Sequence, residues 1–216
     1  MKSQATPLKS HAAYWPLLFA VLLTACTSAP RIIDTHIHLY DTRRDGGVPW
    51  PPPTDDVLFR PTLTQHFDAV CQANGVSGTV IVEASDLVED NQWVLDLVKH
   101  NPDRYIGLVG NLPVGTDEFA GFLDRFAKDK RFVGIRLRSF PKGVDGFTDA
   151  VWRDLNLLAE KGLTLDVLLA NYDLDDIVRI AKRTPNLKIL INHCTGLIIN
   201  GTPADAAWAM KVRAAA

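Results

Sequence analysis

The sequence lacks the features that mark several common classes of protein. Its 216 residues contain no cluster of basic residues, and the formal net charge is only −2. A nucleic-acid-binding surface needs a concentrated positive face, so this composition argues against a nucleic-acid partner. No G-x-S-x-G, G-x-x-x-x-G-K or C-x-x-C motif occurs, which disfavours the common serine hydrolases, P-loop proteins and zinc ribbons.

Cysteine is scarce, with only three residues in the chain. Cys71 and Cys194 lie far apart in the sequence and are too few for a disulfide framework. We therefore expect both to be buried free thiols. The third, Cys26, belongs to the N-terminal segment.

Residues 1–29 differ from the rest and are expected to form a signal peptide and linker. They contain Lys2 and Lys9 but no acidic residue, and an apolar run covers 14–23. This run is too short for a transmembrane helix, which needs about 20 apolar residues, but it fits the core of a secretory signal. The Leu-Thr-Ala-Cys segment that ends at Cys26 resembles the lipobox of bacterial lipoproteins. That resemblance implies lipidation of Cys26 and a membrane-anchored protein of the cell envelope. An ordinary export signal, with a periplasmic product, or an uncleaved anchor remains the alternative.

From residue 30 onward, apolar segments alternate with amphipathic ones. The predicted strands cover 31–39, 78–83, 105–110, 132–138, 163–169 and 187–192, and the predicted helices cover 62–73, 90–100, 116–128, 149–161, 174–183 and 203–213. Thr202 is the expected N-cap of the last helix. This alternation predicts parallel βαβ units of an α/β fold.

Two α/β architectures suit six such units. A doubly wound sheet is one, but no G-x-G-x-x-G turn follows the first strand. Polar residues instead stand at several strand ends, which is typical of (β/α)8 TIM barrels. The sequence therefore predicts an incomplete TIM barrel of about six βα units over residues 30–216.

The first predicted strand carries two histidines in one phase. Strand side chains alternate with a period of two, so His36 and His38 share a face. Neutral imidazole is a good ligand for zinc and other divalent metals. His193 ends the sixth predicted strand and can meet the first two histidines at the mouth of a barrel. The alternative for all three is a structural role.

Charged residues also lie within the predicted strands. Arg136 and Arg138 share a phase on the fourth strand, where buried arginines need a carboxylate partner. That partner is either a substrate or an internal residue, and Glu83 and Asp166 are the internal candidates. We assign these two acids supporting roles. Trp50, beside three prolines, lines the substrate mouth or anchors its own loop.

The pattern resembles the amidohydrolase superfamily. The matching segments are IIDTHIHLYD, FVGIRLRSFP and LKILINHCTG, and the resemblance is to the amidohydrolase-related group of sugar lactonases, dicarboxylate lactonases and aminocarboxymuconate-type decarboxylases. It implies a TIM barrel with a divalent metal, zinc first, held by His36, His38 and His193. His193 and Arg136 would be the catalytic residues, and Arg136 would bind a substrate carboxylate. Some lactonases of the group work without metal, which leaves a metal-free mechanism open.

Members of this group continue to a seventh and an eighth strand, and the eighth carries an Asp in a G-S-D-W-like segment. This chain stops after the sixth predicted helix, so it resembles a C-terminally truncated member. We expect a metal-dependent hydrolase that acts on a small molecule, a lactone or a similar carboxylated ester. The alternatives are a non-oxidative decarboxylase, an inactive lipid-anchored binding protein and, less favoured by the acidic balance, a nuclease. The oligomeric state is left open.

Overall fold

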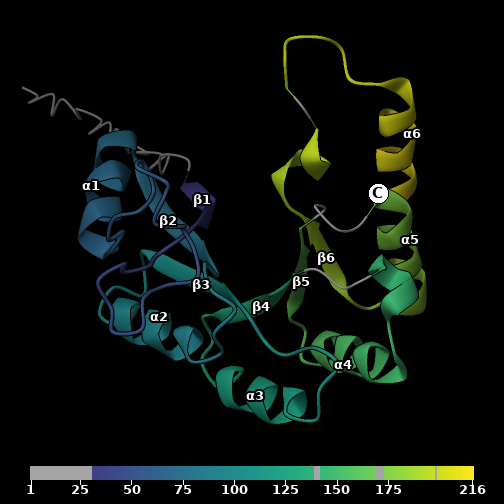
Figure 1. Ribbon diagram of the computed structural model, residues 1–216, viewed down its shortest axis with the longest axis horizontal. Helices are drawn as coiled ribbons and strands as arrows, with labels where there is room; N and C mark the ends of the chain where they lie inside the picture. The colour runs from purple at the N-terminus through teal and green to yellow at the C-terminus, as the bar shows by residue number, and fades with distance from the viewer. Residues whose placement is uncertain (1–30, 139–141, 169–172, 198) are drawn as a thin grey trace, which may run out of the picture. The chain divides into compact units, whose positions relative to one another are not determined.

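Six parallel strands form one sheet whose order follows the chain, β1-β2-β3-β4-β5-β6. The computed structural model describes residues 31–138, 142–168, 173–197 and 199–216. The strands are β1 (Ile32–Ile37), β2 (Val76–Val82), β3 (Tyr105–Gly110), β4 (Phe132–Leu137), β5 (Thr164–Val167) and β6 (Lys188–Ile191). The sheet curls into a half-barrel, which confirms the predicted incomplete TIM barrel (Figure 1).

A helix follows each strand and lies on the convex side of the curled sheet (Figure 1). The helices are α1 (Thr64–Asn74), α2 (Asp90–Val98), α3 (Phe119–Phe126), α4 (Asp149–Glu160), α5 (Leu174–Arg183) and α6 (Ala206–Ala215). Short 3-10 segments, which the sequence did not predict, precede α4 (Gly143–Gly146) and follow β6 (His193–Gly196).

The apolar core lies between the sheet and these helices. Alternate strand residues such as Ile135, Leu165 and Val167 are fully buried there. The residues between them, such as Arg136 and Asp166, face the opposite, concave side, because successive strand side chains alternate. The strand pattern thus places the core on the convex face and sends Arg136 and Asp166 to the concave face.

The start of the last helix differs from the prediction. Helix α6 begins at Ala206, and the Asp205 side chain accepts a hydrogen bond from the backbone of Ala207 at 2.6 Å. The predicted cap, Thr202, instead donates its hydroxyl to Asn200. Asp is at least as good an N-cap as Thr, and here it stands next to the helix.

The cysteine prediction is half right. Cys71 is buried in α1 and free, as expected. Cys194 is free but exposed, because it lies past the end of β6 in the 3-10 segment. Cys26 and the signal segment 1–29 lie outside the described residues. In the part of the chain that the structure describes, no helix is long and apolar enough to cross a membrane.

Candidate active site on the concave face

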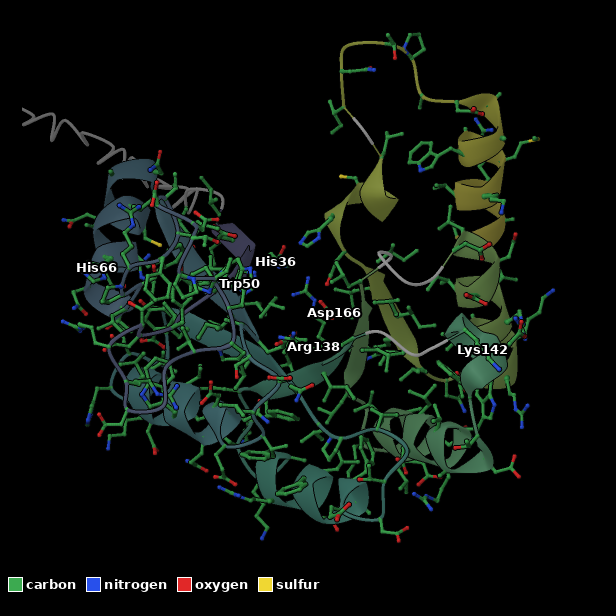
Figure 2. All side chains as sticks on the ribbon, viewed as in Figure 1. His36, Trp50, His66, Arg138, Lys142 and Asp166 are labelled. Carbon is green, nitrogen blue, oxygen red and sulfur yellow. The ribbon has the colours of Figure 1, made fainter. Side chains whose placement is uncertain are left out.

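Three histidines from the two ends of the sheet come together. The ring centroids of His36 and His38 lie 5.1 Å apart, and those of His36 and His193 also lie 5.1 Å apart. His36 lies in β1, His38 follows the end of β1, and His193 follows β6. Two strands that do not pair with each other therefore supply one cluster. Figure 2 shows His36 on the concave side of the sheet, as it also shows Asp166. The predicted meeting of these histidines is therefore found in the structure.

The backbone at His193 explains how this ring reaches the cluster. Strict strand alternation would place His193 in phase with Ile189 and Ile191, which pack against the core. The chain leaves the strand at Asn192, however, and His193 adopts a left-handed conformation with φ of 52°. Such a backbone is uncommon for a residue other than glycine and is concentrated at functional sites. The turn brings the ring beside His36.

The environment keeps the three imidazoles neutral. Burial, reinforced by His38 and Arg136, lowers the pKa of His36 to about 4. The pKa values of His38 and His193 are also lowered, in both cases mainly by burial. Neutral imidazole is the form that binds metal ions or accepts a proton.

The donor atoms of the cluster suit a divalent metal. His38 Nδ1 lies 2.9 Å from the carbonyl oxygen of Val82, and donation to this oxygen leaves Nε2 with a lone pair. Nε2 of His36 is buried and has no hydrogen-bond partner among the described residues. Two imidazoles bound to one tetrahedral zinc, with Zn–N about 2.0–2.1 Å, place their ring centroids roughly 5 Å apart. The measured spacing of 5.1 Å matches that arrangement.

The cluster is nevertheless not a finished coordination sphere. Within residues 31–138, 142–168, 173–197 and 199–216, no three His, Cys, Asp or Glu side chains form a group set to hold a metal ion. The histidines therefore fit a metal by chemistry and spacing, while binding would require the rings to turn toward one point.

The two predicted arginines share an internal carboxylate. Arg136 Nη1 lies 3.8 Å from Glu83 Oε1, and Arg138 donates a hydrogen bond to Glu83 Oε2. Glu83 and Arg136 are buried, whereas the Arg138 side chain is 40% exposed. The sequence left open whether the arginines pair with a substrate or with an internal acid, and the structure shows pairing with the internal acid Glu83. Burial raises the pKa of Glu83 and lowers the pKa of Arg136, although their mutual attraction opposes both shifts.

Asp166 has a partner that the sequence analysis missed. Asn192 Nδ2 donates to Asp166 Oδ2 at 3.0 Å, and both side chains are buried. Asp166 is also the register partner of Arg136 on β4. The sequence hinted at this contact through strand alternation alone. Asn192 stands two residues after Leu190, so the two share a face, and Leu190 pairs with Asp166. Burial raises the pKa of Asp166, against the effects of Asn192 and Arg136.

Trp50 belongs to the long segment between β1 and α1. Its ring centroid lies 5.2 Å from that of His38 and 5.5 Å from that of Tyr40. The ring thus packs against Tyr40 and borders His38, and its contact with a substrate stays a prediction. Trp50 is also among the residues that line a cavity of about 20 Å³, which is room for one water molecule.

An ion pair holds the same segment to α2. Arg44 Nη2 bonds Asp90 Oδ1 at 2.6 Å, and its guanidinium lies 4.7 Å from the centroid of the Trp93 ring. Backbone bonds between Tyr40 and Thr62 close the segment at its base. These contacts fix the loop that carries Trp50.

Residues 33–216 match the Amidohydro_2 family, described as amidohydrolase, and the chain belongs to this family. It is 27% identical over 168 residues to the L-fucono-1,5-lactonase of Burkholderia ambifaria, covering 74% of this chain and 56% of the lactonase. The chain thus spans little more than half the length of that relative.

Solved structures share the fold at lower identity. An amidohydrolase from Burkholderia multivorans with bound zinc is 20% identical, with a TM-score of 0.69, covering 86% of this chain and 66% of that one. A probable 2-pyrone-4,6-dicarboxylic acid hydrolase from Acinetobacter baumannii with citric acid bound is also 20% identical, with a TM-score of 0.58, covering 77% and 59%. Decarboxylases occur among the similar structures as well.

Proposed function

We propose that this site hydrolyses a lactone or a similar small ester, with a divalent metal, zinc first, held by His36, His38 and His193. The observation that carries the proposal is the convergence of three neutral imidazoles from both ends of the sheet. The likeness to a lactonase and to a zinc-containing amidohydrolase supports it. A metal bound there would act as a Lewis acid that polarises the ester carbonyl.

The side chains around the histidines position the substrate. Arg136 has two buried guanidinium nitrogens, Nε and Nη2, with no hydrogen-bond partner among the described residues. They can donate to a carboxylate or carbonyl oxygen of the ligand. Arg138 lies on the same face, and Glu83 and Asp166 hold the arginines in place by charge. Trp50 borders the histidines and shields one side of the ligand from water.

Metal binding and turnover should be measured on the same preparations. We expect purified protein loaded with zinc to retain about one ion per chain and to release acid from six-membered lactones, followed by pH-stat titration. His36→Asn should lose both the metal and the activity, whereas His100→Asn, which alters an exposed histidine, should keep both. Activity that persists in metal-free protein would support the metal-free mechanism. Bound zinc with no turnover would leave a binding role.

Decarboxylation is tested on the same preparations with a different substrate. The fold is shared with decarboxylases, and an aromatic carboxylate such as 2,6-dihydroxybenzoate is the matching substrate. Release of carbon dioxide without any lactone turnover would replace hydrolysis by decarboxylation.

We also propose that the protein is a lipoprotein of the cell envelope, anchored through Cys26. The apolar run 14–23 and the lipobox-like segment support this. Radiolabelled palmitate should enter the wild-type chain in bacterial cells and should not enter the Cys26→Ser variant. Equal labelling of both would refute the anchor.

A further inference from the structure

The fold separates basic from acidic residues that are mixed along the chain. The five connections that lead from a helix to the next strand contain six basic residues and two acidic ones, and the six connections that lead from a strand to the next helix contain five basic and twelve acidic ones. The six basic residues of the first set are Lys99, Arg104, Lys128, Lys130, Arg131 and Lys161. Because the strands are parallel, the first set lies at the amino-end edge of the sheet and the second at the carboxyl-end edge. The amino-end edge is therefore basic, whereas the edge that carries the histidines is acidic.

A groove lies where two of the basic connections meet α2 and α3, which are neighbours on the convex side (Figure 1). Its volume is about 570 Å³. The apolar side chains that line it include Leu95, Pro102 and Phe126, and its basic lining residues are Arg125, Lys128, Lys130 and Arg131. The groove thus combines apolar surface with a positively charged border.

One guanidinium nitrogen in this groove is left without an acceptor. Arg125 donates to both carboxylate oxygens of Glu89, at 2.6 and 2.8 Å. Arg131 donates from Nε and Nη2 to Asp129, and its third terminal nitrogen, Nη1, is buried with no hydrogen-bond partner among the described residues. Buried polar atoms in folded proteins are nearly always paired. Nη1 of Arg131 therefore calls for an acceptor that a ligand can bring.

Two lysines of the groove are also uncommitted. Lys128 and Lys130 are exposed and form no ion pair among the described residues. The carboxylate near Lys128, Asp124, pairs with Lys161 at 2.6 Å. Asp96 on α2 acts on Arg131 by its charge and has no basic partner of its own within the described part of the chain. The two lysines outweigh this single carboxylate, so the groove suits an anion with several acceptor oxygens, such as a phosphate group.

The proposed lipid anchor attaches at the same edge of the sheet. Arg31 directly precedes β1, at the amino end of the first strand, and Cys26 stands five residues earlier in the sequence. Five residues span at most about 18 Å. Strands β1 and β4 are three steps apart in the sheet, which is roughly 15 Å. A lipid on Cys26 would thus keep the basic edge close to a bilayer.

We propose, building on the anchor proposed above, that the amino-end edge of the sheet is a docking surface for an anionic bilayer. Lys128, Lys130 and Arg131 bind the phosphate group of a lipid in the groove. The acidic carboxyl-end edge is repelled by the same surface. The histidine cluster therefore faces away from the membrane, toward substrates in solution.

Binding to vesicles tests the docking surface. The full chain with Cys26→Ser, which carries no lipid, is sedimented with vesicles of phosphatidylcholine alone or of phosphatidylcholine mixed with anionic phosphatidylglycerol. We expect at least about tenfold tighter binding to the anionic vesicles, because basic residues near an anionic surface are attracted to it, and added salt should weaken this preference. Equal binding to both kinds of vesicle would overturn the proposal.

Inorganic phosphate separates a lipid from a soluble ligand. It should displace the protein from anionic vesicles more effectively than chloride of equal ionic strength, because it competes for the groove itself. Binding of free phosphate without any preference for anionic vesicles would assign the groove to a soluble phosphate compound and would defeat membrane docking.

Charge-reversal variants locate the surface. Lys128→Glu/Lys130→Glu should lose the preference for anionic vesicles. The matched control, Arg60→Glu/Lys142→Glu, changes the net charge equally at two exposed residues of carboxyl-end connections and should keep it. An equal loss in both would reveal an effect of net charge alone and would refute the surface. If the first variant does not fold, Lys128→Gln/Lys130→Gln decides, with a smaller loss expected.

Thiol labelling reports the orientation on the vesicle. Asn101→Cys introduces an exposed thiol in the α2–β3 connection, at the basic edge, and Cys194 is an exposed thiol beyond the end of β6. Anionic vesicles should slow the reaction of a water-soluble maleimide at position 101 and leave the rate at Cys194 unchanged, as followed by mass spectrometry of the separate peptides. Protection of Cys194 with none at position 101 would contradict the orientation.

The anchor and the docking surface fail in different ways. A chain that takes up no palmitate but prefers anionic vesicles would defeat the anchor and leave the docking surface standing. A chain that is labelled at Cys26 and shows no such preference would do the reverse.

Discussion

Replacing Gly134 by alanine should disturb the spacing between β4 and β5. A Cβ atom added there would lie 2.0 Å from Thr164 Oγ1 and 2.6 Å from the Thr164 carbonyl oxygen. The hydroxyl can rotate away, but the carbonyl belongs to the backbone of the paired strand. The two strands must therefore separate by several tenths of an ångström.

The size of the effect follows from the rigidity of that obstacle. Overpacking of a well-packed interior typically costs about 1–3 kcal/mol, and a backbone obstacle places Gly134→Ala near 3 kcal/mol. Gly121→Ala is the matched control. It lies in α3, where an added Cβ meets no atom within 4 Å. There alanine should stabilise the protein by up to about 1 kcal/mol, because glycine is a poor helix former.

Urea denaturation followed by circular dichroism measures both variants, and lactone turnover measures the effect on the site. Gly134 precedes Arg136 by two residues, and Arg136 is in register with Asp166. Gly134→Ala should thus lower lactone turnover as well as stability. An unfolding free energy within about 0.5 kcal/mol of the wild-type value, the range of an ordinary surface substitution, would refute the reasoning. Full rescue by Thr164→Ala would show that the hydroxyl, not the carbonyl, is the obstacle.

Three further predictions concern acid, a buried phenol and the β1–α1 segment. In metal-free protein, the free energy of unfolding should fall as the pH is lowered from about 6.5 to about 4. The reason is that the pKa of His36 is about 4 in the folded chain, so the unfolded chain binds a proton there more readily. Urea titrations across this pH range should show a smaller fall for His36→Asn. Tyr105→Phe removes a 2.9 Å hydrogen bond to Asp68 and should lower the unfolding free energy by about 1 kcal/mol, measured by the same titration. Arg44→Met breaks the ion pair with Asp90 and should speed amide hydrogen exchange in residues 41–61 while leaving exchange in the strands unchanged.

Much of the fold could be predicted because each strand is marked by its own residues. Strand β3 and helix α5 have the predicted bounds, since apolar runs and amphipathic periods begin and end there. The phase of His36 and His38 followed from alternation alone. The choice between a doubly wound sheet and a barrel came from the polar strand ends.

The features of the site that the sequence did not predict depend on contacts between segments that are distant in the chain. The sequence left Arg136 with two alternative partners, and only the curvature of the sheet places Glu83 beside it. The position of His193 depends on a left-handed backbone that its neighbours do not encode in any simple pattern. Asn192 was missed because its partner, Asp166, is on another strand.

The order of the strands has a consequence for how the site tolerates change. His36 and His193 belong to opposite ends of a sheet in which every strand pairs only with its neighbours in the chain. The distance between these rings therefore depends on five successive strand-to-strand steps, and small changes in twist accumulate along the series. Substitutions of residues in β3 or β4 that do not contact a ligand should therefore still change the affinity of the site for that ligand. Sequence variation that preserves this site must conserve the curvature of the sheet as well as the histidines.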